Sequence, residues 1–147
     1  MSTRLARMVS AVFAAMVAAT VLSVAAPAQA ATPTCNASGT VTAADGYTHI
    51  NIPMYYVAST NTRNYTCLLS VGNSSNAVYT LERTLKEQYG YNITVNTAFT
   101  TETKNALLDL QAELCCGLDV DGVYGPQTRD ALCWVQVGGG GCMFRVW

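Results

Sequence analysis

Apolar residues recur at helical spacing through the second half of the chain. The spacing predicts helices over residues 76–89, 101–114 and 126–137. Gly90 suits the position after the first helix, and Pro126 suits the first position of the third. We expect the apolar faces of these helices to form one core, made of Val78, Leu81, Leu85, Ala106, Leu107, Leu110, Ala131, Leu132 and Val135.

The pattern changes before Gly72. Residues 48–52 alternate between polar and apolar side chains, which predicts a short strand that Pro53 ends. Residues 54–57 and 65–69 are two further apolar and aromatic runs. A small hairpin or meander is therefore predicted in this half of the chain.

Residues 1–30 have the pattern of a secretory signal peptide. Two arginines precede an uncharged stretch over residues 8–26, and residues 28–30 form an A-x-A cleavage site. A membrane anchor is the alternative, because the stretch is just long enough to span a bilayer. Its many small residues and the cleavage motif favour the signal. We expect cleavage before Ala31 and a secreted, extracellular protein.

The charge of the chain argues against several classes of partner. It has eight basic and nine acidic residues, and two of the basic residues lie in the predicted signal. The mature chain therefore keeps six basic residues against nine acidic ones, without a block of one sign. Such a chain lacks the electrostatic footprint of a protein that binds nucleic acid or anionic lipid. We expect neither nucleic acid nor, after signal cleavage, a membrane as a partner.

Six cysteines follow the predicted cleavage site, namely Cys35, Cys67, Cys115, Cys116, Cys133 and Cys142. An even number in a small exported chain is typical of a disulfide framework. Three bridges can form in fifteen ways, and the sequence leaves the pairing open. Cys35 and Cys67 bracket the strand-rich segment and could staple it. A zinc site needs C-x-x-C spacing or more histidines, so we expect no metal and no cofactor.

An internal repeat with an offset of 25 residues relates residues 95–111 to residues 120–136. Each copy reads as a turn, an aromatic residue and a helix. The paired positions are Val95 and Val120, Asn96 and Asp121, Phe99 and Tyr124, Thr103 and Thr128, Ala106 and Ala131, Leu107 and Leu132, and Gln111 and Gln136. Asn or Asp can begin a tight turn, and a threonine in the first helical turn can bond an unpaired N–H.

These residues resemble the peptidoglycan-binding domain found beside the catalytic domains of many bacterial cell-wall hydrolases. The family pattern Asp-Gly-x-Phe-Gly-x-x-Thr-x-x-Ala-Val is nearly intact over residues 121–132. The first copy has lost both glycines, and Glu82 replaces the glutamine of the opening Val-x-x-Leu-Gln motif. The similarity covers residues 72–137. It implies a compact three-helix fold, binding to cell-wall glycan or stem peptide and hence a cell-wall-associated protein, and it does not imply catalysis.

We therefore expect a mainly α fold, a compact three-helix domain with a short strand/turn segment before it, stapled by disulfides. The expected organisation is a signal peptide over 1–30 and a strand/turn segment over 31–71. A peptidoglycan-binding-like domain follows over 72–137, and a glycine linker with an apolar tail over 138–147. We expect this tail to pack back onto the domain.

The family places its ligand groove near the repeat loops. The candidate ligand-binding residues are Asn96, Asp121, Gly122, Tyr124, Gly125 and Thr128. Short polar groups there could bond sugar hydroxyls, and the Tyr124 ring could stack on a sugar face. Each candidate also has a structural alternative, since polar residues can shape turns, glycines can meet backbone requirements and the aromatic rings can be core.

No catalytic residue is predicted, so the chain is not expected to be an enzyme. His49 lies near no nucleophile motif. The glutamates on the predicted helices, Glu82, Glu102 and Glu113, are interpreted as solvated charges. The predicted function is a secreted, non-catalytic module that binds peptidoglycan. A secreted disulfide-rich protein that binds or inhibits a protein partner is the alternative, and a minimal wall hydrolase is a third possibility.

Overall fold

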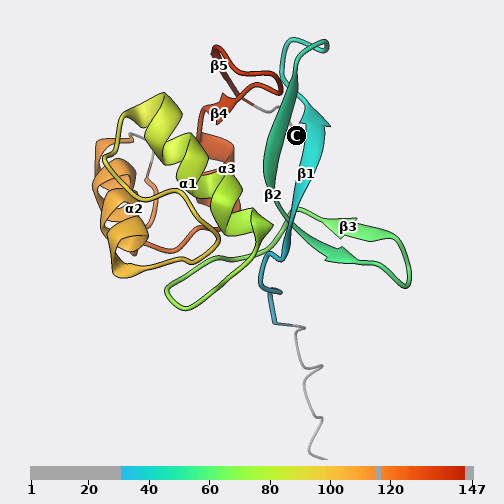
Figure 1. The fold of residues 1–147 in the computed structure, drawn as a ribbon, viewed down its shortest axis with the longest axis horizontal. Coiled ribbons are helices and arrows are strands. Elements are labelled where there is room, and N and C mark those ends of the chain that lie inside the picture. Colours follow the sequence, from blue (N-terminus) through green and yellow to red (C-terminus); the bar gives the residue numbers. More distant parts are fainter. Residues whose placement is uncertain (1–30, 115–116, 145–147) are drawn as a thin grey trace, which may run out of the picture. The chain divides into compact units, whose positions relative to one another are not determined.

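A layer of helices lies against an antiparallel sheet (Figure 1). The computed structural model describes residues 31–114 and 117–144, which belong to one compact unit. The helices are α1 (Asn76–Tyr89), α2 (Thr101–Glu113) and α3 (Pro126–Ala131). The predicted signal peptide, Cys115, Cys116 and the last three residues lie outside the described residues. In the described part of the chain, no helix is long and apolar enough to cross a membrane.

The sheet has the order β1 (Ala37–Thr42), β2 (His49–Val57) and β3 (Thr62–Asn64). Alternate residues of β2 turn toward the helices, and Ile50 and Ile52 are fully buried. The predicted end of this strand at Pro53 is wrong, because β2 continues to Val57. At Pro53 the strand has β1 on one side, while β3 pairs only from Tyr55 onward. A proline is tolerated where a strand lacks a neighbour on one side.

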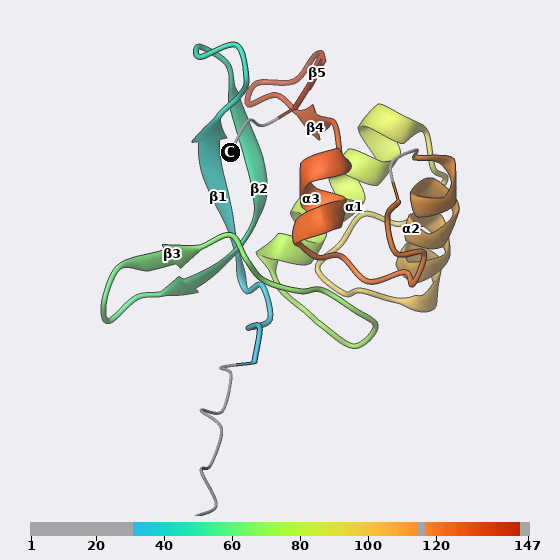
Figure 2. The same cartoon turned by 180° about the vertical axis from the view of Figure 1, so that it is seen from behind.

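The end of β2 and β3 form an arm that leaves the body of the fold, as both ribbon views show (Figures 1 and 2). The register pairs Tyr55 with Asn64 and Val57 with Thr62. The residues of β3 and of the turn before it are mostly exposed. The arm therefore contributes little to the core, which lies between β2 and the helices.

The first helix has the predicted bounds, and the second ends one residue earlier than predicted. Gly90 ends α1 in a left-handed conformation (φ 75°), from which its N–H reaches the carbonyls of Leu85 and Lys86. This is the helix end that glycine favours. The apolar stripe of α1 is buried, with Val78, Leu81 and Leu85 all 0% exposed.

The third helix is shorter than predicted, because it ends at Ala131 and not at residue 137. Residues 132–135 are all buried, a run that a helix with one apolar face does not produce. The chain instead forms β4 (Trp134–Val135), which pairs with β5 (Cys142–Met143). A disulfide between Cys133 and Cys142 closes this pair.

The expectation of a mainly α fold is wrong. Of the described residues, 29% are helical and 26% lie in strands or bridges, in two sheets. The strand segment is not an appendage, because Ile50, Ile52 and Leu69 share one core with the residues of the helices. A disulfide joins Cys35 to Cys67 and fixes the two ends of the strand segment.

Candidate functional site

The loop of the second repeat connects α2 to α3 through a tight turn at Asp121. One carboxylate oxygen of Asp121 accepts the N–H of Val123 at 2.8 Å. Gly122 has a φ of +68°, and a Cβ there would lie 2.7 Å from the Lys104 side chain. The residue must therefore be glycine for two reasons, the left-handed backbone and the close approach of α2.

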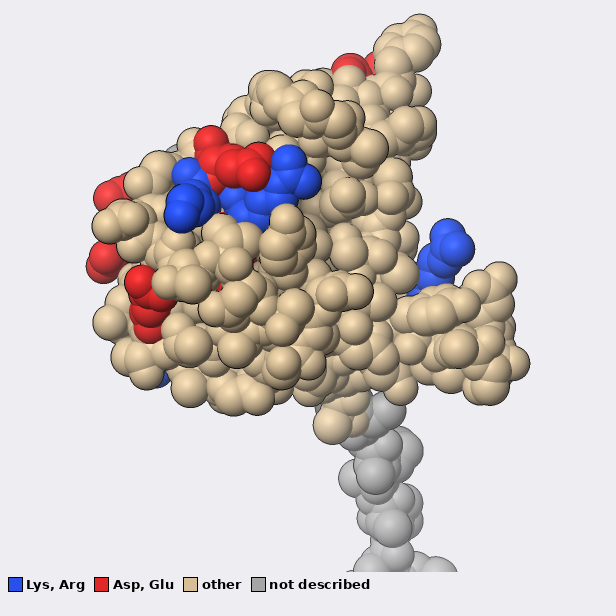
Figure 3. All heavy atoms as spheres, in the orientation of Figure 1, with Lys and Arg blue, Asp and Glu red and all other residues tan. Residues whose placement is uncertain are grey.

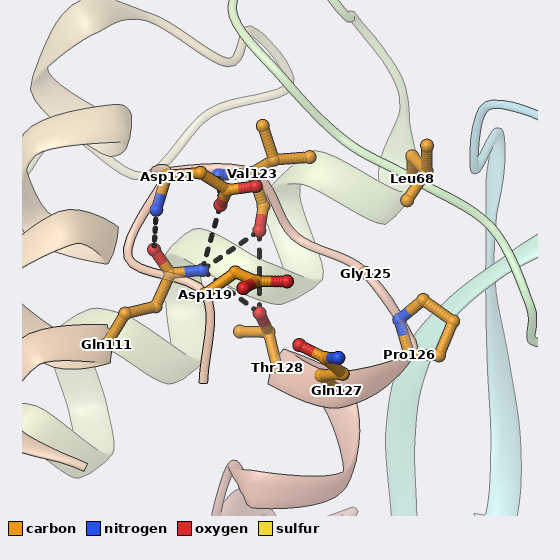
Figure 4. Close-up of a pocket in the computed structure, with 9 residues that line it drawn as sticks. All are labelled: Leu68, Gln111, Asp119, Asp121, Val123, Gly125, Pro126, Gln127 and Thr128. Atoms are coloured by element: carbon orange, nitrogen blue, oxygen red, sulfur yellow. Dashed lines mark hydrogen bonds between the residues drawn. The ribbon is translucent and has the colours of Figure 1, made fainter. Parts of the chain in front are cut away.

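Gln111 of α2 holds this loop in place (Figure 4). Its side-chain oxygen accepts the N–H of Asp121 at 3.2 Å and that of Gly122 at 2.8 Å. Its amide nitrogen lies within hydrogen-bonding distance of the Val123 carbonyl (3.0 Å), the Thr128 hydroxyl (3.1 Å) and the Asp121 carboxylate (3.3 Å). Gln111 is buried, and these bonds satisfy both ends of its amide.

Tyr124 lies beneath the loop with its ring in the core. The residue is 0% exposed and meets Trp134 edge to face, with ring centroids 6.1 Å apart. Its backbone exchanges two hydrogen bonds of 2.9 Å with Leu69, which ties the loop to the strand segment. Burial raises the pKa of the Tyr124 hydroxyl. The structure therefore gives this ring a packing role and leaves no face of it open to a sugar.

A pocket of about 310 Å³ opens at the same loop (Figure 4). Polar side chains from α2, the loop and the start of α3 meet aliphatic ones from the loop and the strand segment. The lining residues are Leu68, Gln111, Asp119, Asp121, Val123, Gly125, Pro126, Gln127 and Thr128. Asp121, Gly125 and Thr128 of the sequence-predicted set thus come together here. Gly122 lies in the turn beside them, and Asn96 does not line this pocket.

Leu68 brings the strand segment into the pocket. The Leu68 N–H donates to the Pro33 carbonyl, and the Cys35 N–H donates to the Leu68 carbonyl, each at 3.0 Å. The Cys35–Cys67 disulfide is adjacent. A Cβ on Gly125 would lie 3.1 Å from the Leu68 side chain, tighter than an ordinary contact. Glycine at this position therefore leaves room for Leu68, which keeps 36% of its surface exposed.

In the first repeat, a buried side chain also holds the loop, but the residue is a glutamate and not a glutamine. Glu82 of α1 is 0% exposed, and its carboxylate accepts the Asn96 N–H at 2.7 Å and the Thr103 hydroxyl at 2.6 Å. Burial raises its pKa, against the lowering effect of these two hydrogen bonds. Asn96 shapes its own turn by accepting the Ala98 N–H at 2.6 Å. The interpretation of Glu82 as a solvated charge is wrong.

The other residues considered as catalytic or metal-binding candidates do not form a cluster. His49, Glu102 and Glu113 are exposed, and no group of three metal-ligating side chains occurs among the described residues. On the face drawn in Figure 3, basic and acidic side chains lie side by side over the helices, and most of the surface over the sheet is uncharged. That face has no broad patch of one sign.

A second cavity, of about 600 Å³, lies between the end of α2, α3 and the C-terminal segment. It is lined by Leu114, Gly117, Leu118, Gln127, Asp130, Ala131 and Phe144. Gln127 borders both cavities, but none of the sequence-predicted ligand residues lies here. The first pocket is therefore the candidate site.

The comparison with protein-family models agrees with the repeat. Residues 74–132 match the model of the peptidoglycan binding domain family. This part of the chain belongs to that family. The match includes both repeat loops and every residue of the pocket except Leu68.

A solved structure of a peptidoglycan-binding protein from Clostridioides difficile, in complex with glutamine hydroxamate, is similar to the chain at 25% sequence identity. The similarity has a TM-score of 0.45 and covers 63% of this chain and 54% of that protein. The chain therefore spans about half the length of that protein. A search of curated proteins finds no match.

Proposed function

We propose that this protein is exported and binds the peptidoglycan of a bacterial cell wall without cleaving it, through the face formed by the second-repeat loop. The family match carries the proposal, because its residues 74–132 contain the loop and nearly the whole pocket. The pocket is concave, and a few polar groups converge on it beside aliphatic walls, as in small-ligand sites generally.

The groups in the pocket suit binding better than bond cleavage. A nucleophilic hydroxyl needs a base that can take up its proton. The Thr128 hydroxyl instead bonds the Gln111 amide and the Val123 carbonyl, which cannot take up a proton. The Asp121 carboxylate accepts hydrogen bonds from the loop and from Gln111, so it also serves the structure of the turn.

The proposed export is tested by the mass of the protein recovered from the culture medium. The pattern over residues 1–30 predicts a chain that starts at Ala31, and six cysteines predict three disulfides. Two of these disulfides, Cys35–Cys67 and Cys133–Cys142, lie in the described residues. Free thiols in the denatured, non-reduced protein would count against the third.

Binding is tested by co-sedimentation of the mature protein with purified sacculi, at two salt concentrations. Wild-type protein should pellet, and no soluble wall fragments should appear in the supernatant. Asp121→Asn keeps the oxygen that shapes the turn and removes the charge. Loss of a charge-assisted bond costs about 1.5–3 kcal/mol, so binding should weaken by roughly one to two decades. Asp109→Asn, an exposed position on α2, is the matched control.

The outcome also decides between the two functional classes. Wild-type protein that is folded by circular dichroism but stays in the supernatant would refute wall binding. The alternative, a secreted protein that binds or inhibits a protein partner, would then take its place. Release of soluble fragments from the sacculi would refute the non-catalytic part of the proposal alone.

A further inference from the structure

We propose that the pocket takes the stem peptide of peptidoglycan, with a free side-chain amine of a diamino residue at its acidic end and a small alkyl group at its apolar end. This inference rests on the proposed function and names the part of the wall that the site recognises. It follows from the chemistry of the pocket walls and from what those walls lack.

The acidic end of the pocket is suited to a cation. Asp119 and Asp121 both line it and both are exposed. Neither forms an ion pair with a lysine or arginine in the described part of the chain, and the Asp119 carboxylate accepts no hydrogen bond from a described residue. Two carboxylates that share a concave surface without a protein cation favour a positively charged ligand group. Figure 4 shows them across the pocket from Leu68 and Pro126.

The opposite end is aliphatic. Leu68 and Pro126 offer apolar surface there, which suits a methyl or other small alkyl group. Leu68 lies outside the family-matched residues, and its position depends on the bonds around the Cys35–Cys67 disulfide. The strand segment thus adds an apolar contact that the matched residues alone would not supply.

The same walls are poorly suited to the glycan. A sugar ring presents an apolar face that an exposed aromatic ring can cover, but none of the described residues that line this pocket is aromatic. Tyr124 of the loop and Trp134, whose ring packs against it, are both 0% exposed. An N-acetylated glycan also carries no amine to meet the two carboxylates. A stem peptide carries both required groups, a diamino side chain and the methyl groups of alanine.

Cross-linking of the wall converts the amine that this site would bind into an amide. An amine converted to an amide has no positive charge, so its attraction to Asp119 and Asp121 is lost. The protein should therefore favour peptides that are not cross-linked through that amine. Acetylation of the amine reproduces this change in a small soluble peptide.

The experiment measures binding of the mature chain to three soluble probes by titration calorimetry. The probes are the N-terminally blocked tripeptide N-acetyl-L-Ala-γ-D-Glu-L-Lys, the same peptide acetylated also on the lysine side-chain amine, and the disaccharide of N-acetylglucosamine and N-acetylmuramic acid. We expect the free-amine peptide to bind at least tenfold more tightly than the acetylated one, as for a charge-assisted bond. The disaccharide should bind more weakly than either peptide.

Two variants assign the contacts. Asp119→Asn should reduce the preference for the free amine, since only Asp121 remains, and leave affinity for the acetylated peptide unchanged. Leu68→Ala should weaken the binding of both peptides about three- to tenfold, because it removes apolar contact with the ligand. The matched controls are Asp109→Asn and Val71→Ala, since Val71 is an exposed aliphatic residue of the same segment. Circular dichroism shows whether each variant is folded.

The failure of this inference is distinct from the failure of wall binding. Equal affinity for the two peptides, or tighter binding of the disaccharide, would overturn the inference while sacculi still sediment the protein. Binding of neither peptide by a protein that does pellet with sacculi would also overturn it. If wild-type protein does not pellet with sacculi, the proposed function itself fails.

Discussion

The hydroxyl of Thr103 donates a hydrogen bond of 2.6 Å to the carboxylate of Glu82, and both residues are buried. The second repeat has the same arrangement, with an amide in place of the carboxylate, where Gln111 lies 3.1 Å from the Thr128 hydroxyl. In each repeat, a residue that follows a buried leucine on one helix therefore fixes the loop and the first turn of the next helix. The two sites differ in whether the buried group can ionise.

Replacing Glu82 by glutamine should stabilise the protein at neutral pH. Burial raises the pKa of Glu82 above its usual 4.5, so the folded state favours the protonated form. The resulting stability is complete below pH 4.5 and is lost as the pH rises through the raised pKa. Glu82→Gln has no such loss. In urea melts, the variant should exceed wild type in free energy of unfolding at pH 7, and the gap should narrow toward pH 4.

The control for this prediction is Glu113→Gln, which changes an exposed glutamate at the end of α2. Its stability should follow that of wild type across the same pH range. If Glu82→Gln is less stable than wild type at pH 7, the ionised carboxylate contributes more through its hydrogen bonds than its burial costs, and the prediction is wrong.

Replacing Gln111 by methionine should loosen the second-repeat loop. The change keeps the length of the side chain but leaves the N–H groups of Asp121 and Gly122 without the oxygen that accepts them. A buried polar group left unbonded costs about 1–3 kcal/mol. Chemical denaturation should show a loss of at least this size. Gln127→Met, at an exposed position on the same pocket, should be close to neutral.

The two described disulfides should differ in their contribution to stability. Cys35 and Cys67 are 32 residues apart, whereas Cys133 and Cys142 are 9 apart. A longer closed loop restricts the unfolded chain more, by about 1 kcal/mol for this difference in the chain-entropy model. Serine replacement of the first pair should therefore lower the melting temperature more than replacement of the second pair. A larger loss of melting temperature for the second pair would contradict the prediction. It would mean that the disulfides act mainly on the native state and not on the unfolded chain.

Leu107→Ala tests the helical core. Leu107 is 0% exposed on α2, and truncation of such a leucine typically costs about 2–5 kcal/mol. Val120→Ala removes aliphatic atoms from a side chain that is 53% exposed, so it should change the free energy of unfolding little. Similar denaturation midpoints for the two variants would contradict the assignment of Leu107 to the core.

The sequence predicted the parts of the fold that depend on local pattern. The bounds of α1 and the start of α2 follow from apolar spacing and from the glycine after Tyr89. The strand β1 was missed, because Ala37–Thr42 holds mostly small and polar residues, and its pairing with β2 is a tertiary contact. The end of α3 was missed for a similar reason, since β4 forms by pairing with residues beyond a glycine-rich loop.

The candidate site could be predicted only in part. The repeat pointed to the loop around Asp121, where the pocket lies. The loop contacts of Glu82 and Gln111 were not predicted, although Glu82 stands at the glutamine position of the opening Val-x-x-Leu-Gln motif and Gln111 also follows a leucine. Leu68 had no signal at all, because its place in the pocket depends on the backbone bridge between Leu69 and Tyr124.

That bridge limits how this protein can be used as a portable tag for attaching cargo to cell walls. A fragment cut to the family-matched residues 74–132 would leave out Leu68, and α1 would lose the cover of Ile50 and Ile52. A working tag should therefore begin at Ala31. It should also be produced where the Cys35–Cys67 disulfide can form, so an oxidising expression compartment becomes part of its design.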